Sequence, residues 1–183
     1  MRWEDDDRQY RVRLARGVAR QLVTKHRLSI PIDVEGFCRK VAGIEIYFEE
    51  GIDERVSAVL RRDLGAILVN ANKPRVHTRF SIAHELGHWY LHSDSAVMGE
   101  RTVPLAVINE ALDVEANAFA AEFLMPATAV RELVRVGVAD LPALAARFEV
   151  SQEAMWYRLN ELRLARSVRP SARGNGGSPG FVT

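Results

Sequence analysis

The sequence has little cysteine, no long hydrophobic segment and almost no net charge. Its single cysteine, Cys38, excludes a disulfide within the 183 residues and fits a reducing compartment. No apolar run is long enough to span a bilayer, and the acidic start MRWEDDDRQ lacks the apolar core of a secretory signal. A net charge of +1 favours no partner by bulk electrostatics. We therefore expect a cytoplasmic protein without membrane contact.

Hydrophobic periodicity and turn residues predict an α+β fold, a small sheet followed mostly by helices. Apolar residues make up 48% of the chain and charged residues 27%, enough for one main core. The predicted helices cover residues 8–26, part of 29–43, 78–92, 109–126 and two segments within 140–164, and the predicted strands cover 44–50, 55–62 and 65–70.

Single residues mark several of these boundaries. Asn109 is placed to cap the helix that it begins, and Pro126 to end that helix. Ser151 is placed to cap the last helix, and residues 93–108 are expected to form a loop. Cys38 lies in an apolar stretch and should be a small core residue.

The stretch AHELGH, residues 83–88, indicates a metal site. His84 and His88 are four residues apart, so on a helix they are rotated by only about 40° and can bind one zinc ion. Glu85 is turned by about 100°, so it can reach a water without ligating the metal. The alternative is an ordinary helix, but two buried histidines beside a glutamate are costly without partners.

A zinc site of this kind needs a third protein ligand. His92 is a further turn along the same straight helix, too far to converge with the other two, and we interpret it as a supporting or packing residue. On the later helix, Glu115 and Glu122 flank the apolar face, whereas Glu110 and Asp113 are expected to point away. Glu115 is preferred because Glu122 sits in the last turn.

Two stretches together resemble the ImmA/IrrE group of metallo-endopeptidases, which are gluzincin-like zinc proteases: RFSIAHELGHWYLH (79–92) and VEANAFAAEFLMP (114–126). The resemblance covers the chain from about Leu22 to Leu164. It implies a zinc ion held by His84, His88 and Glu115, with Glu85 as the catalytic base. Manganese could occupy the same ligands, because two imidazoles and a carboxylate are not selective.

The resemblance also implies a substrate: proteins of this group cleave helix-turn-helix transcriptional repressors, relieving repression of stress-response or mobile-element genes. A transition-state stabiliser is needed as well, and Tyr157, His77 and His92 stay open as candidates. By analogy with zinc proteases, the substrate is expected to pair with an edge strand such as residues 65–70.

Residues 140–164 have the spacing of a helix-turn-helix. Their charge is nearly balanced, so we do not expect tight DNA binding and interpret them as a helical cap or docking surface. We divide the chain into a zincin-like metallopeptidase domain with N-terminal helices (1–130), this helical region (131–166) and a disordered tail (167–183). The alternative function is a non-catalytic regulator that binds DNA or a repressor and carries a structural zinc.

Three arginines of the first predicted helix, Arg13, Arg16 and Arg20, form a stripe opposite its apolar face. We interpret the stripe as a solvated helix face. The alternative is a surface for an anionic partner.

Overall fold

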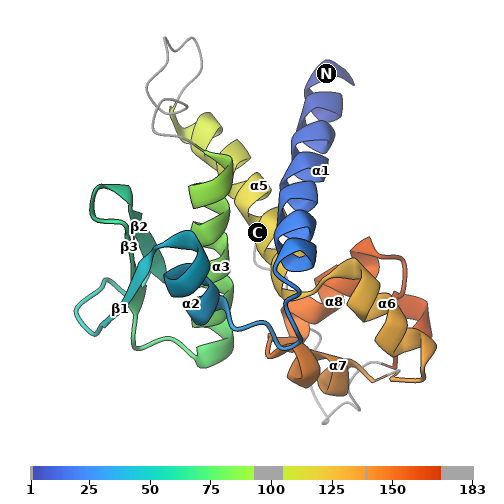
Figure 1. Ribbon diagram of the computed structural model, residues 1–183. Helices are drawn as coiled ribbons and strands as arrows, with labels where there is room; N and C mark the ends of the chain where they lie inside the picture. The colour runs from blue at the N-terminus through green and yellow to red at the C-terminus, as the bar shows by residue number, and fades with distance from the viewer. Residues whose placement is uncertain (1, 93–104, 139, 170–183) are drawn as a thin grey trace.

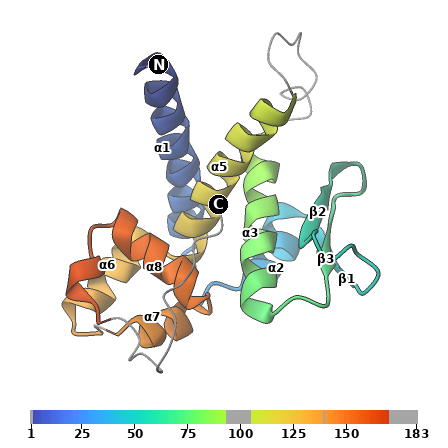
Figure 2. The same ribbon diagram turned by 180° about the vertical axis from the view of Figure 1, so that it is seen from behind.

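The computed structural model describes residues 2–92, 105–138 and 140–169. It confirms the α+β class, with helices dominating and one sheet of three strands in the described part. Figures 1 and 2 show helices α3 (Arg75–Leu91) and α5 (Leu105–Leu124) as a central pair. The sheet and the short helix α2 (Val34–Phe37) lie on one side of this pair, and the other side holds α6 (Ala127–Arg135), α7 (Leu141–Phe148) and α8 (Gln152–Glu161). None of the described helices combines the length and the apolar character needed to cross a membrane.

The N-terminal helix α1 runs from Arg2 to Lys25, so it begins upstream of the predicted start at residue 8. A cis Ile30–Pro31 bond precedes the short helix α2, Val34–Phe37, which continues as a π-helical turn over Cys38–Ala42. Gly43 ends this turn with φ 69°, a conformation that glycine adopts without strain. Cys38 is fully buried, as predicted.

The strands form a sheet in the order β1-β3-β2, with β1 at Glu45–Glu49, β2 at Ala58–Arg61 and β3 at Ala66–Asn70. Strand β3 pairs in parallel with β1 and antiparallel with β2. The expectation that residues 65–70 form an edge strand is therefore wrong, because β3 is central and buried. The strand with an open edge beside the helices is β2.

Helices α3, Arg75–Leu91, and α5, Leu105–Leu124, pack closely against each other. Their close approach depends on Gly87, where an added Cβ would lie 3.1 Å from the Cα of Ala116. The predicted cap at Asn109 is wrong, since α5 begins four residues earlier at Leu105. No glycine or proline occurs between 105 and 109 to stop the helix there.

The C-terminal region contains the two predicted helices, α7 at Leu141–Phe148 and α8 at Gln152–Glu161, and one that was not predicted, α6 at Ala127–Arg135. Ser151 caps α8, as expected: its hydroxyl accepts a hydrogen bond from the Ala154 amide at 3.0 Å. Val168 is buried, and the Arg169 carbonyl accepts from Leu141 N at 3.1 Å. The rest of the predicted tail, 170–183, lies outside the described residues.

A buried charge network ties α8 to α5 and α1. Arg158 is 1% exposed; its guanidinium pairs with Glu122 and with Glu161 and donates to the Met125 carbonyl at 3.0 Å. From α1, Arg20 reaches Glu122 at 3.3 Å and Arg16 reaches Glu161 at 3.2 Å. Two of the three arginines predicted to be solvated therefore bind carboxylates of the neighbouring helices.

Candidate metal centre

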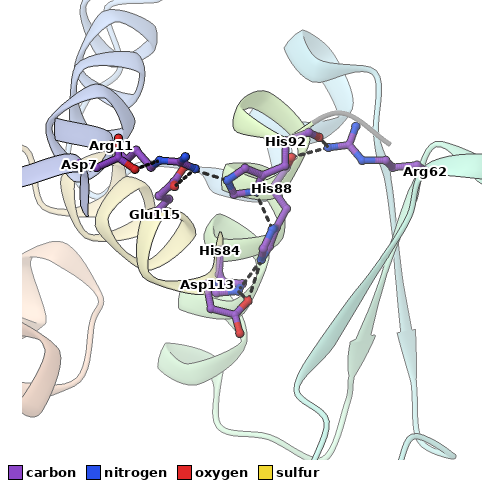
Figure 3. Close-up of polar contacts among 8 residues, drawn as sticks. All are labelled: Asp7, Arg11, Arg62, His84, His88, His92, Asp113 and Glu115. Carbon is purple, nitrogen blue, oxygen red and sulfur yellow. Dashed lines mark hydrogen bonds and ion pairs between the residues drawn. The ribbon is translucent and has the colours of Figure 1, made fainter. Parts of the chain in front are cut away.

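The side chains of His84 and His88 project from α3 towards α5 and converge with a carboxylate (Figure 3). Their Nε2 atoms are 3.0 Å apart. The Oδ1 atom of Asp113, from α5, lies 3.3 Å from Nε2 of His88 and 3.7 Å from Nε2 of His84. One helical turn separates the histidines, so they share a face as predicted, and the third donor comes from the neighbouring helix.

These three groups fit a divalent metal ion. Their donor atoms all lie within 4.8 Å of one another, and two imidazoles with one carboxylate are a ligand set that zinc uses in proteins. Burial lowers the pKa of His84 and lowers that of His88 to about 4, with the neighbouring His84 and His92 adding to the effect at His88. Both imidazoles are therefore neutral at physiological pH, as metal ligation requires.

The other nitrogen of each imidazole is held by an outer partner. His84 Nδ1 lies 2.9 Å from Oδ1 of Asn117, four residues after Asp113 on α5. His88 Nδ1 lies 2.9 Å from Nδ1 of His92. If each ligand donates its Nδ1–H to this partner, its Nε2 lone pair faces the site. Partners of this kind fix the tautomer and the orientation of metal-binding histidines.

Glu115 lies next to His92, the partner of His88 Nδ1. Its Oε2 accepts from His92 Nε2 at 3.1 Å, and its Oε1 lies 3.6 Å from a guanidinium nitrogen of Arg11 on α1. The contacts form a chain from Arg11 through Glu115 and His92 to His88 (Figure 3). A carboxylate accepting from His92 leaves the His92 Nδ1 lone pair free to accept from His88.

The structure thus brings Asp113, rather than Glu115, to the two Nε2 atoms, and the expectation that Asp113 points away is wrong. The physical reason is that α5 is contacted on two sides, by α3 and by α1. A single apolar face was assumed from the sequence, but the Gly87–Ala116 contact turns the Asp113 side towards α3. Glu122 is held by Arg158 and Arg20, away from the histidines.

Arg62 connects the C-terminal end of α3 to the segment that joins strands β2 and β3. From the turn between β2 and β3, its guanidinium donates to the backbone carbonyls of His88 and His92 (Figure 3). It also lies over the ring of Trp89, 5.1 Å from the centroid. A cation at a helix C-terminus is stabilising, and here it fixes the turn of α3 that carries His88.

Glu85 lies beside the donor atoms and is directed towards the sheet. Its Oε2 accepts from the Leu60 amide of β2 at 3.2 Å. Burial raises the pKa of Glu85 to about 7, and the nearby Asp113 carboxylate adds to the shift while the Leu60 hydrogen bond opposes it. A carboxyl group with this pKa can both accept and release a proton near neutral pH.

Glu85 and His84 line a cleft of about 370 Å³ that also includes Ser57, Phe80 and Asn117. None of the three predicted stabilisers lines it. His77 contacts the Ser57 hydroxyl at 2.7 Å and, with Tyr157, lines an adjoining cavity instead. His92 is 7% exposed and lies behind His88, which agrees with its interpretation as a supporting residue.

Comparisons with known proteins identify related chains. The family model for the IrrE N-terminal-like domain, peptidase family M78, matches residues 39–160. A solved Mycobacterium tuberculosis transcriptional regulator is 21% identical to this chain and matches it with a TM-score of 0.62, and the match covers 80% of this chain and 46% of the regulator. At this identity the regulator shares the fold, and this chain spans less than half of its length. A search of curated proteins finds no match.

Proposed function

Since the chain belongs to the IrrE N-terminal-like family, peptidase family M78, we propose that it is a zinc-dependent endopeptidase. The family indicates a metallopeptidase-type protein. The observation that carries the proposal is the convergence of His84, His88 and Asp113 with Glu85 beside them and outside the donor set. We assign the metal to His84, His88 and Asp113. Manganese is compatible with the same donors.

A divalent metal, when bound, polarises a scissile carbonyl and lowers the pKa of water. The chain's own part is proton transfer by Glu85, which takes a proton from the attacking water and returns it to the leaving amine. The Leu60 amide holds the carboxylate between the donor atoms and strand β2.

Strand β2 is the place where a substrate would bind. The Leu60 amide points away from β3 towards Glu85, so the open edge of β2 borders the cleft. A substrate segment in extended conformation would add to this edge through main-chain hydrogen bonds. That pairing would place a peptide bond next to Glu85 without unfolding a whole domain.

We propose a protein substrate, and specifically a transcriptional repressor with a helix-turn-helix, whose cleavage relieves repression. The family supports a protein substrate, and the resemblance to the ImmA/IrrE group supports a helix-turn-helix repressor as that substrate. Direct DNA binding is disfavoured, because α8 carries the carboxylates of Glu153 and Glu161 and lines a cavity beside the cleft.

The second candidate is a non-catalytic regulator with a structural metal. A structural metal site does not require a buried carboxyl group beside its ligands, and the carboxyl group of Glu85 is buried there with a raised pKa. Burying it disfavours its charged form, so its presence favours the peptidase.

The test compares wild-type protein with Glu85→Gln, which keeps the size of the side chain but cannot accept the proton. Both are loaded with zinc and mixed with a helix-turn-helix repressor, and fragment masses are recorded. We expect equal metal content and turnover at least about 10²-fold lower in the variant. Glu110→Gln, exposed on the same helix as Asp113, is the matched control and should cleave normally. Equal cleavage by Glu85→Gln would refute the mechanism, and bound zinc without cleavage by wild type would favour the regulator.

A further inference from the structure

We infer that the cavity adjoining the metal centre is a specificity pocket that receives one large apolar side chain of the substrate peptide. The inference rests on the proposed peptidase function. It assigns a role to the C-terminal helices, because α8 and the turn before it form one wall of the cavity.

The cavity and the cleft share a wall. The cavity has a volume of about 540 Å³ and lies between α3, α5 and α8. Phe80 and Asn117 line both spaces. Asn117 is also the residue that holds His84, and Phe80 is one helical turn before His84. A helical turn rises about 5.4 Å and an extended residue spans about 3.3 Å, so a side chain one or two residues from the cleaved bond reaches the cavity.

The lining is predominantly apolar. Helices α3, α5 and α8 contribute Phe80, Ala121, Ala154 and Tyr157, and Met125 contributes from the residue just after α5. Tyr157 lines the cavity and is 56% exposed, so part of its ring is open to contact with an incoming side chain. A concave apolar space with a few polar groups at its margin is the usual form of a site that recognises one side chain.

The charges at the margin indicate the neighbouring residue of the substrate. The Arg158 guanidinium is neutralised by Glu122 and Glu161. Glu153 lines the cavity and has no ion-pair partner among the described residues. A single unpaired carboxylate favours a basic residue beside the apolar one, so the preferred occupant is a large apolar side chain next to Lys or Arg.

The experiment uses zinc-loaded full-length protein and a set of synthetic ten-residue peptides. Each peptide carries Leu, Phe, Ala or Gly at one varied position and Lys or Glu beside it, and kcat/KM and cleavage sites are read by mass spectrometry. Ala154→Phe fills the cavity, and Tyr157→Ala removes an aromatic ring from its lining. Trp156→Ala is the matched control, because Trp156 is a partly exposed aromatic on the same helix that does not line the cavity.

Wild type should prefer Leu or Phe over Ala at one fixed distance from the cut, by about tenfold or more. Ala154→Phe should lose that preference while still cleaving the Ala and Gly peptides, which also shows that it is folded. Tyr157→Ala should weaken the preference, and Trp156→Ala should retain it. Cleavage by wild type without any apolar preference, or an unchanged preference in Ala154→Phe, overturns the pocket while leaving the peptidase intact.

Absence of cleavage by wild type would instead contradict the peptidase. The pocket is then judged by fluorescence polarisation with the same peptides, labelled and added to zinc-loaded protein. Tighter binding of the Leu–Lys peptide than of the Ala–Lys peptide, lost in Ala154→Phe, would support it. Equal binding of the two peptides would overturn it.

Discussion

Replacing Glu115 by Gln is expected to weaken metal binding without abolishing it. Glu115 does not reach the Nε2 atoms of His84 and His88, but its carboxylate accepts from His92 Nε2, and His92 in turn holds Nδ1 of His88. Gln keeps the shape of the side chain and loses its negative charge, so the imidazole of His88 becomes a weaker ligand for the metal ion. Loss of an outer partner of this kind costs about 10- to 100-fold in metal affinity, or about 1.4–2.8 kcal/mol.

Two further variants define the scale of that effect. His92→Phe removes the link between Glu115 and His88 and should fall in the same range as Glu115→Gln. Asp113→Ala removes one of the three converging donors and should lose far more affinity. Glu110→Gln, exposed on the same helix, should match wild type.

The assay is competition for zinc with a chromophoric chelator, combined with circular dichroism to verify folding. Complete loss of the metal in Glu115→Gln, together with wild-type affinity in Asp113→Ala, would contradict the assignment of Asp113 as a ligand. That result would return Glu115 to the ligand position that its sequence neighbourhood suggested.

Three other predictions concern stability. Because burial raises the pKa of Glu85 to about 7 from an ordinary 4.5, the folded metal-free protein binds more protons than the unfolded chain between these values, so its stability should fall as pH rises through that window. Urea unfolding of metal-free Glu85→Gln should therefore show a gain over wild type at pH 8 of about 1–3 kcal/mol that is much smaller near pH 4.5, and no difference between the two pH values would contradict the shift. Gly87→Ala places a Cβ 3.1 Å from the Cα of Ala116 and should lower the free energy of unfolding by about 1–3 kcal/mol. Gly17→Ala, whose Cβ would meet no atom within 4 Å, should raise the stability of α1 by about 0.5–1 kcal/mol. Thermal melts compare the two variants, and a neutral Gly87→Ala would contradict the close contact. Arg158→Met leaves Glu122 buried without its main partner and should cost about 3–5 kcal/mol in chemical denaturation, so a loss below about 1 kcal/mol would show that the network matters little.

The elements with strong periodic signals could be predicted from the sequence. The pattern of residues 44–50 and the apolar run of residues 65–70 predicted strands β1 and β3, and Ser151 marked the start of α8. The order of the strands could not be predicted, because short strands carry no information about their neighbours. Helix α6 was missed because Pro126, taken as the end of one helix, is also the cap of the next.

The candidate metal site was also predictable only in part from the sequence. The positions of His84, Glu85 and His88 follow from helical spacing alone, because all three lie on one element. The carboxylate that meets them comes from a second helix, whose rotation is set by packing at Gly87 and by contact with α1. A signal was present in the spacing of Asp113 and Asn117, four residues apart, which places both on the face towards α3.

We propose that His84, His88 and Asp113 together hold one divalent metal ion. Anomalous diffraction at the zinc absorption edge, from crystals of the zinc-loaded protein, tests it most directly. We expect one peak within about 2.0–2.2 Å of Nε2 of His84, Nε2 of His88 and a carboxylate oxygen of Asp113, with Glu85 and Glu115 outside that distance. A peak bonded to Glu115 in place of Asp113, or no peak between the two histidines, would contradict it.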